Sequence, residues 1–584
     1  MKRVLACLLS ICLLLTCIGT ACADGYTAGT YTGVGKGNNG EIKVEVTFSA
    51  DKIESVKVVE HGETAGICDK PIEQIPAAIV EKQSVEVDTV SGATNTSNGI
   101  IAAVVDAARQ AGVDLTAVEQ NTLKDVSCDV VVVGAGLAGL AAAKSAAENG
   151  ASVVLVEKQA IVGGSGNLTS AGFYVSETAY VPAEVETHEE MYQHIVDMIN
   201  EGGTTDNVEL DRIRHLVDEG PALTEWLEGM GYEFTVTDFS IKDAKPHYQL
   251  LADGSMGAGQ VKLITAACEK EGVSILTETE CIALNQENGA MTGITVKTAE
   301  GTFNINAKSV VLTCGGYGRN QEMIMRLQPQ SLFSETCTNV GATGEVLQMA
   351  ADLGAAWYND QFMLTCGFTT DPSVASLGMA LYPPYASMPV IDQTGHRFMN
   401  EFLLWTLNSE MVRNVENAPF FAIFDSEFLK GTAAEFKYDA LEEAIAAGSK
   451  WVFKADTLEE LAARCGIKDV EAFKATIASY NSVKGTDDAE PEYGVPNNQL
   501  SFVEDGPFYA VLVVSLNAGT MGGIKTQITG EVLNYKGETM TGLYAAGEAS
   551  NGGLYDRGYI SGTSVLNCYI AGRDAGASAA AFAK

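Results

Sequence analysis

Basic residues and prolines are scarce in this sequence. Its 584 residues include 37 Lys and Arg against 75 Asp and Glu, which gives a formal net charge of −38, and only 14 are Pro. Nucleic acids and anionic membrane surfaces bind clustered Lys and Arg, so neither is expected as the main partner. A hydrophobic fraction of 46% and a charged fraction of 19% are typical of globular proteins and argue against a disordered acidic chain.

The sequence also lacks the cysteine spacings of the common metal sites. None of its 13 Cys forms a CxxC or CxxCH motif. Zinc, iron–sulfur and covalently attached haem sites therefore have no ligand set, and no metal is expected. Beyond the first 23 residues, no run approaches the roughly 20 apolar residues that a membrane-spanning helix needs.

The first 23 residues have the composition of a secretory signal. Two basic residues precede an apolar run over 4–15, and small residues at 21–23 suit a signal peptidase, so the mature chain is expected to begin near Asp24. A lipoprotein anchored on Cys17 or Cys22 is the alternative, although the surrounding residues match a lipobox poorly. We expect an exported protein at the extracellular or cell-envelope face.

Residues 26–112 have the pattern of a small α+β module. Alternating apolar and polar residues predict paired strands over 41–48 and 53–61, and helical spacing follows over 72–83. A Gly-containing turn then runs into a second, polar-capped helix. A polar linker over 113–125 separates this module from the rest of the chain.

The segment 128–158 carries a dinucleotide-binding pattern. It is predicted to form a strand, a glycine turn, a helix and a second strand, with Gly134, Gly136 and Gly139 in GxGxxG spacing and Glu157 at the end of the second strand. The first glycine makes the turn, the second lets a pyrophosphate approach, and the third lets helix and strand pack. Glu157 can bind the adenosine ribose. NAD and FAD both use this pattern, which predicts an α/β fold.

The N-terminal module resembles the FMN-binding domain family. The carriers of this resemblance are GTYTGVGKG (29–37), HGET (61–64) and DTVSGAT (88–94). The resemblance implies FMN joined through a phosphodiester to Thr94 by a dedicated FMN transferase, at a turn formed by Ser91, Gly92 and Ala93. An ordinary Ser- and Thr-rich turn that caps a helix is the alternative. His61 could support the fold or contact the flavin.

The remainder resembles the flavoproteins of the fumarate reductase/succinate dehydrogenase superfamily. The matching segments are VGGSGNLTSAGF (162–173), SVVLTCGGYGRN (309–320), TGEV (343–346), GHRFMNE (395–401), PFYAV (507–511), TMGGI (520–524) and GLYAAGEAS (542–550). The resemblance implies a Rossmann-like FAD-binding domain over 126–358 and 515–584, interrupted by an α+β capping domain over 359–514. FAD would be bound non-covalently in an extended pose, with Glu548 near the ribityl chain. The residues expected to hold FAD are Gly134, Gly136, Ala138, Gly139, Glu157, Lys158, Gly164, Ser165, Gly166, Asn167, Gly315, Glu548, Ser564 and Val565.

This combination resembles secreted relatives of flavocytochrome c fumarate reductase and urocanate reductase that lack the haem domain. It implies an electron route from a membrane-associated donor through FMN and FAD to a small unsaturated substrate, as in anaerobic respiration. A flavin dehydrogenase similar to the ketosteroid dehydrogenases, and an electron carrier with no substrate of its own, are the alternatives. The FMN module favours reduction, because it provides an entry for electrons.

Several positions depart from the fumarate reductase pattern. Trp405 stands where that family places its proton-donating Arg, Ala518 and Gly519 replace a paired His, and Tyr559 replaces the carboxylate-binding Arg. A dicarboxylate would lack compensating charge there, so fumarate is not the expected substrate. The aromatic and small replacements favour a larger, flatter acceptor such as an enone or an aryl-acrylate.

Four residues are candidates for the chemistry. Tyr559 lies in a segment that resembles the ketosteroid dehydrogenases, in which a Tyr hydroxyl polarises the substrate carbonyl. Arg557 could hold a carboxylate or form a surface salt bridge, and His247 could carry a proton or be an ordinary loop residue. Trp405 could form a platform for the substrate or pack in the core.

Overall fold

The computed structural model divides the chain into two compact units, Met1–Asn121 and Thr122–Lys584, and each is described by itself. The structure describes residues 26–37, 40–63, 68–85, 87, 94–113, 115, 124–169, 172–202, 208–238, 247–331, 334–358, 362–369, 388–401, 407–431, 438–555 and 558–584. Within these residues, no helix is both long enough and apolar enough to cross a membrane.

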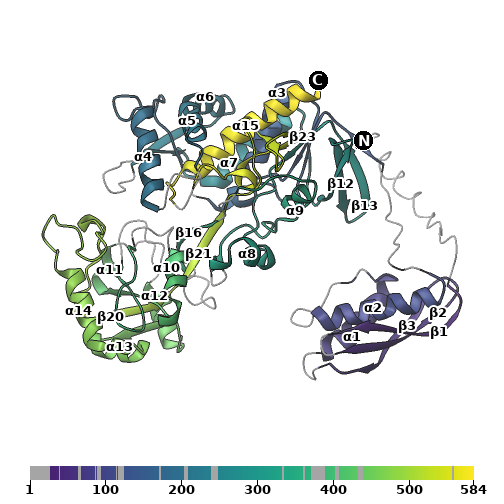
Figure 1. Ribbon diagram of the computed structural model, residues 1–584, viewed down its shortest axis with the longest axis horizontal. Coiled ribbons are helices and arrows are strands. Elements are labelled where there is room, and N and C mark those ends of the chain that lie inside the picture. Colours follow the sequence, from purple (N-terminus) through teal and green to yellow (C-terminus); the bar gives the residue numbers. More distant parts are fainter. Residues whose placement is uncertain are drawn as a thin grey trace, which may run out of the picture. The chain divides into compact units, whose positions relative to one another are not determined.

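The first unit is a three-stranded antiparallel sheet with two helices (Figure 1). The strands are β1 (Gly29–Lys36), β2 (Glu41–Phe48) and β3 (Ile53–His61), and the helices are α1 (Asp69–Lys82) and α2 (Thr94–Gln110). Strands β2 and β3 coincide with the two predicted strands. Helix α2 lies so close to β1 that a Cβ on Gly33 would be 1.9 Å from the Ala103 carbonyl oxygen. Only glycine fits at this position.

A six-stranded sheet forms the centre of the second unit. Its strand order is β10-β6-β5-β14-β23-β22, and all neighbours are parallel except β22 and β23. Strands β5 and β6 are continuous apolar runs, as expected for strands covered on both faces. The strands are β5 (Val130–Val133), β6 (Val153–Val156), β10 (Ser274–Leu276), β14 (Ser309–Leu312), β22 (Glu531–Leu533) and β23 (Thr539–Ala545).

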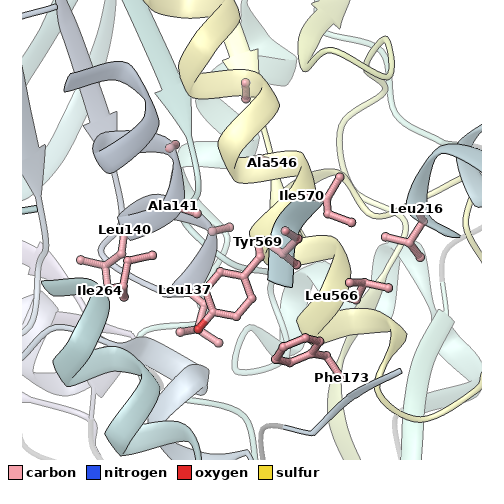
Figure 2. Close-up of a cluster of buried hydrophobic side chains, with 14 of the residues drawn as sticks. Leu137, Leu140, Ala141, Phe173, Leu216, Ile264, Ala546, Leu566, Tyr569 and Ile570 are labelled. Carbon is pink, nitrogen blue, oxygen red and sulfur yellow. The ribbon is translucent and has the colours of Figure 1, made fainter. Parts of the chain in front are cut away.

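Helices α3 (Leu137–Glu148), α7 (Met256–Lys270) and α15 (Thr563–Ala583) pack together beside this sheet. Figure 1 shows α15, in yellow, next to α3 and β23. The two helix backbones approach closely, since a Cβ on Gly576 would lie 2.1 Å from the Ala142 carbonyl oxygen. Figure 2 shows the core they share, in which Leu137 and Leu140 of α3 and Leu566, Tyr569 and Ile570 of α15 are buried.

Smaller elements surround the central sheet. A four-stranded sheet has the order β11-β12-β13-β4, and a three-stranded sheet has the order β7-β9-β8. The strands are β4 (Val126–Ser127), β7 (Phe173–Tyr174), β8 (Phe234–Asp238), β9 (His247–Leu251), β11 (Glu280–Glu287), β12 (Ala290–Thr298) and β13 (Gly301–Asn306). The helices are α4 (His188–Gly202), α5 (Leu210–Asp218), α6 (Gly220–Glu228), α8 (Gln321–Leu327) and α9 (Glu345–Asp352).

An antiparallel sheet of order β17-β18-β20-β19 and its helices have a separate core. The strands are β17 (Val390–Ile391), β18 (Phe421–Asp425), β19 (Val452–Ala455) and β20 (Phe508–Leu512). The helices are α10 (Leu407–Arg413), α11 (Ser426–Gly431), α12 (Tyr438–Ala446), α13 (Leu458–Cys465) and α14 (Val470–Asn481). Strands β15 (Glu335–Thr336), β21 (Val514–Met521) and β16 (Phe362–Thr369) form the remaining sheet.

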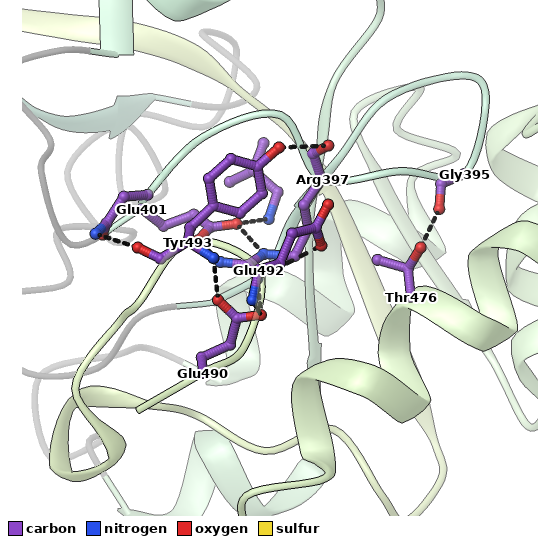
Figure 3. Close-up of polar contacts among 9 residues, drawn as sticks. Gly395, Arg397, Glu401, Thr476, Glu490, Glu492 and Tyr493 are labelled. Atoms are coloured by element: carbon purple, nitrogen blue, oxygen red, sulfur yellow. Dashed lines mark hydrogen bonds and ion pairs between the residues drawn. The ribbon is translucent and has the colours of Figure 1, made fainter. Parts of the chain in front are cut away.

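A buried ion network ties this antiparallel layer together (Figure 3). The Arg397 side chain is fully buried, and its guanidinium forms ion pairs with Glu401 and, at 2.7 Å, with Glu490. The same guanidinium lies 5.0 Å from the ring centroid of Tyr480 and 4.9 Å from that of Tyr493. The GHRFMNE segment is therefore held by an arginine that has two carboxylates and two aromatic rings around it.

Candidate active site

The described part of the second unit contains a cavity of about 550 Å³ at the carboxyl ends of β5, β6 and β14. In open parallel sheets this edge is where ligands bind, because the loops that leave the strands converge there. The cavity runs from Glu157 and Lys158 at the end of β6 to Ser564 and Val565 at the start of α15. Its walls therefore combine residues from the first strands of the central sheet with residues near the end of the chain, so one ligand can contact both.

The glycine turn after β5 has the geometry that a pyrophosphate requires. Gly134 has φ of +101°, and a Cβ there would lie 2.6 Å from the Thr313 carbonyl oxygen. Gly136 precedes the first residue of α3 and lines the cavity together with Ala138, so the helix N-terminus faces the ligand space. Gly139 does not line the cavity; a Cβ there would lie 1.9 Å from the Gly134 carbonyl oxygen, which shows that it permits the turn itself.

Glu157 is fixed beside this turn by backbone donors. Its two carboxylate oxygens accept hydrogen bonds from the backbone N–H of Ala135 and of Gln159, each at 2.9 Å. A carboxylate oxygen can accept more than one hydrogen bond, so Glu157 is still able to bind ribose hydroxyls. The neighbouring Lys158 donates to Thr343 Oγ1 at 2.5 Å and pairs with Glu345 at 3.2 Å.

The second glycine loop closes over the same cavity. Gly164, Ser165 and Gly166 line it from the short 3₁₀ helix Gly164–Leu168. Asn167 is not among the lining residues; its side-chain amide donates to the Val162 carbonyl at 2.8 Å and so holds the loop closed. Gly163, with φ of +112°, leaves the space for that amide.

Glu548 lies on the wall of the cavity near α15. It accepts hydrogen bonds from the backbone N–H of Thr520 at 2.7 Å and from the Thr520 hydroxyl at 2.9 Å. Removal from water raises the pKa of Glu548, and these hydrogen bonds only partly offset that effect. Gly315, with φ of +71°, lies next to the Glu548 carboxylate.

The first turn of α15 closes the cavity opposite the glycine turn. Gly562 precedes the helix with φ of +86°, and Ser564 and Val565 line the cavity. The free N–H groups and the positive end of a helix stabilise negative charge. A dinucleotide whose pyrophosphate lies at α3 and whose anionic ring lies at α15 fits this arrangement. The described residues therefore fit FAD, with the glycine turns supplying space that any side chain would fill.

Tyr559 lies where the cavity meets this helix. Its ring centroid is 5.3 Å from that of Tyr555, whose hydroxyl donates to Thr563 Oγ1 at 2.9 Å. Ala518 and Gly519 of β21 also line the cavity, so the two positions that replace the family's histidines face the ligand space.

The other sequence-based candidates are placed as follows. Trp405, Arg557, Ser91, Gly92 and Ala93 lie outside the described residues. Thr94 is the first residue of α2.

His247 is the first residue of β9 and pairs with Asp238 of β8. The structure does not place it on the cavity wall; instead it interacts electrostatically with the buried Glu186.

Several lining residues carry no sequence signal that predicts them. Cys281 reaches the cavity because β11 begins there, and Asn339 and Gly341 come from a loop between β15 and α9. A hydrogen bond of 2.9 Å between Gln159 and Asn339 joins this loop to the end of β6. These residues could be found only from the order of the strands, although the Gly341–Gly344 pair indicates a tight turn.

The comparisons with known proteins agree with this geometry. A model of the FAD binding domain family matches residues 129–565, and a model of the FMN-binding domain family matches residues 37–109. The chain is 30% identical to a urocanate reductase of Eggerthella lenta, covering 96% of this chain and 94% of that protein. It is 30% identical to a vinyl phenol reductase of Lactiplantibacillus plantarum, covering 79% and 97% respectively.

Longer relatives and solved structures are also similar. The chain is 27% identical to an NADH:acrylate oxidoreductase of Vibrio harveyi over 95% of its own length. It spans only 61% of that protein and 57% of an NADH:fumarate oxidoreductase of Klebsiella pneumoniae. The open conformation of a flavocytochrome c3 fumarate reductase superposes with a TM-score of 0.62 at 26% identity, covering 78% of this chain and 79% of that one.

These matches confirm the predicted fold class and superfamily, because the FAD model covers most of the chain and the urocanate reductase aligns nearly end to end. The glycine turns, the fixed Glu157 and the two converging helix N-termini are the structural basis of the match. The chain belongs to the FAD-binding flavoprotein family of the fumarate reductases and urocanate reductases, and it carries an FMN-binding domain before the FAD-binding core.

Proposed function

We propose that this protein reduces the activated C=C bond of an enone or an aryl-acrylate-like acceptor, and that fumarate is not its substrate. The observation that carries this proposal is the charge of the cavity wall. Among the described lining residues the only cation is Lys158, which is paired with Glu345 at the end of β6. The wall at Ala518, Gly519 and Tyr559 contains small and aromatic groups instead.

A dicarboxylate would be poorly bound at such a wall. Each carboxylate that leaves water without a cation or a hydrogen-bond donor loses about several kcal/mol. An acceptor with one carboxylate or none has less charge to compensate, and its ring or chain can pack against Tyr559. Three relatives are named for acceptors with one carboxylate or none, namely urocanate, vinyl phenol and acrylate. These names support the proposed class of acceptor.

The chain's own groups then have separate tasks. When bound and reduced, FAD supplies a hydride. We propose that Tyr559, which lines the cavity, donates a hydrogen bond to the acceptor's carbonyl or ring substituent and so stabilises the negative charge that develops there. Glu548, with its raised pKa, and Thr520 hold the cofactor end of the cavity, and the N-terminus of α15 stabilises an anionic ring.

The first unit would supply electrons to the second. We propose that Thr94 carries FMN through a phosphodiester that an FMN transferase forms, and that a membrane-associated donor reduces it. The position of Thr94 at the start of the 17-residue helix α2 supports this, because a helix N-terminus favours a phosphate. The signal-like N-terminal sequence supports export to the cell-envelope or extracellular face, with a lipid anchor as one form of it.

The proposal is tested with the full chain, produced together with an FMN transferase. Oxidation of dithionite-reduced methyl viologen is followed with urocanate, 4-vinylphenol, cinnamate, a simple enone, acrylate and fumarate. We expect kcat/KM for the best aryl or enone acceptor to exceed that for fumarate by about 100-fold, equivalent to about 2.7 kcal/mol. Fumarate as the best acceptor, or no acceptor that oxidises the dye, would overturn the proposal.

A further inference from the structure

A cluster of three titratable side chains, two of them buried, lies next to the part of the cavity wall that contains Gly562 and Tyr559. Tyr174 of β7 donates a hydrogen bond to Glu186 Oε1, and His194 Nδ1 of α4 lies 2.9 Å from the same oxygen and 3.1 Å from the Tyr174 hydroxyl. None of these three groups is among the residues that line the cavity. They come from two elements and the loop between them, so no local motif connects them.

The cluster extends from solvent to the interior. The side chain of His194 is 30% exposed, that of Glu186 is 4% exposed, and Tyr174 is fully buried. The exposed end is an imidazole, whose two ring nitrogens can each bind or release a proton. Exposure therefore falls in the order in which the three groups are hydrogen-bonded.

The buried end contacts the cavity wall. Tyr174 pairs with Tyr248 across β7 and β9, and their ring centroids are 6.1 Å apart. The ring of Tyr248 packs against Gly562, where a Cβ would lie 2.6 Å from its Cε1 atom. Gly562 lines the cavity beside Tyr559. The cluster thus adjoins the wall where the proposed acceptor would lie.

Glu186 has the properties of a proton carrier. Its second oxygen, Oε2, is buried and has no hydrogen-bond partner among the described residues. A buried carboxylate oxygen without a donor disfavours the ionised form. Burial accordingly raises the pKa of Glu186 above its usual value, although the hydrogen bonds from Tyr174 and His194 and the charges of His194 and His247 act to lower it.

We propose that His194, Glu186 and Tyr174 form a proton-transfer chain that connects solvent, through Tyr248, to the substrate end of the cavity. The inference rests on the proposed function, since reduction of a C=C bond consumes one proton from solvent for each hydride that is added. Tyr248 gives up its hydroxyl proton to the cavity and receives the proton of Tyr174. Tyr174 is reprotonated by Glu186, Glu186 by the imidazolium of His194, and His194 by water.

The groups that face this chain define its pH response. Glu190 of α4 lies near His194 and Tyr174, and His247 of β9 lies near Glu186. The protonated Glu186 is the competent form, so the proton supply should decrease as the pH rises through the raised pKa of Glu186. A carboxamide in its place can accept the same hydrogen bonds at one oxygen but cannot carry the proton.

The experiment compares Glu186→Gln with Glu184→Gln, an exposed glutamate of the same loop, in the flavin-loaded full chain. The reduced protein is mixed with an aryl or enone acceptor, and flavin reoxidation is followed by absorbance. We expect E186Q to lower this rate by about 100-fold, as for loss of a general acid, to remove the high-pH decrease, and to leave reoxidation by ferricyanide unchanged. Tyr174→Phe should act in the same direction, and E184Q should behave as wild type.

A second measurement does not depend on any acceptor. Infrared spectra of the oxidised protein in H₂O and D₂O should contain the C=O band of a protonated carboxyl group that exchanges rapidly with solvent. The band should be absent from E186Q and present in E184Q. If no acceptor reoxidises the wild-type flavin, the proposed function fails, and the infrared band alone then tests whether Glu186 is a protonated, solvent-connected group. Equal reoxidation rates in E186Q and wild type, or a carboxyl band that E186Q leaves unchanged, would overturn the proton-transfer chain.

Discussion

Replacement of Arg397 by Met should open the antiparallel layer of β17 to β20 without removing apolar packing. The arginine side chain is 0% exposed and is the ion-pair partner of Glu401 and Glu490, which are 1% and 0% exposed. Its removal leaves two buried carboxylates without a cation (Figure 3). Breaking a buried ion pair by removing one partner costs about 3–5 kcal/mol.

This free energy should appear as faster hydrogen exchange in the layer. At about 1.4 kcal/mol for each tenfold change, the population of the locally opened layer should increase by about two to nearly four orders of magnitude. The measurement is amide exchange of β18 and β20, followed by mass spectrometry. Arg413→Met is the matched control, because Arg413 is 63% exposed and pairs with Glu410 at the surface.

The effect should also depend on pH with a defined sign. In the wild type, burial raises the pKa of Glu401, whereas the hydrogen bonds from Arg397 hold the pKa of Glu490 below its usual value against the effect of burial. Without Arg397 both folded-state pKa values rise above the unfolded value near 4.5. A raised folded-state pKa means stability that is present at low pH and lost as the pH rises. The deficit of R397M should therefore shrink as the pH falls from 7 toward 5.

A triple variant separates charge from packing. R397M/E401Q/E490Q removes the uncompensated carboxylates, so it should recover much of the lost protection at pH 7. Exchange in R397M that matches the wild type, or a triple variant that opens as readily as R397M, would refute the reasoning.

Three further outcomes are expected from the cavity and its surroundings. Gly139→Ala places a Cβ 1.9 Å from the Gly134 carbonyl oxygen and should distort the glycine turn. The absorbance of the purified protein should then show little bound FAD. A normal FAD content would contradict the role assigned to Gly139. Glu157→Gln should weaken FAD binding by about tenfold in a titration of the apoprotein, as for loss of a charged hydrogen bond, and an unchanged Kd would show that Glu157 does not contact the ribose. Desolvation raises the pKa of Cys314 to about 12 and that of Cys128 to about 11, although both side chains are only partly buried. Iodoacetamide should therefore modify these thiols in the folded protein only as the pH approaches those values, and rapid alkylation at pH 8, mapped by mass spectrometry, would contradict the raised pKa values.

The part of the site that could be predicted from the sequence consists of local patterns. Gly134, Gly136 and Glu157 lie in one strand–helix–strand unit, and the spacing of such a unit determines where its residues meet the ligand. Ser564 and Val565, in the first turn of α15, are expected at the cofactor only through the family resemblance and not through a local spacing.

The remaining part depends on topology. Asn339 and Cys281 reach the cavity because of where β15 and β11 lie, and neither position has a distinguishing residue pattern. Tyr174 lies on β7, Glu186 in the following loop and His194 on α4, and no local spacing predicts that their side chains meet. His247 begins strand β9 and interacts electrostatically with Glu186, and no residue pattern in the sequence predicts that neighbour.

The close packing of α15 on α3 has a consequence for the order of assembly. Gly572 and Gly576 contact the backbone of α3 without any side chain between them, and the first turn of α15 completes the cavity wall. Strands β5 and β6 are synthesised more than 400 residues before this helix. During synthesis, the half-site formed by the glycine turn would have to wait for α15, so FAD can be enclosed only after Thr563–Ala583 has been made.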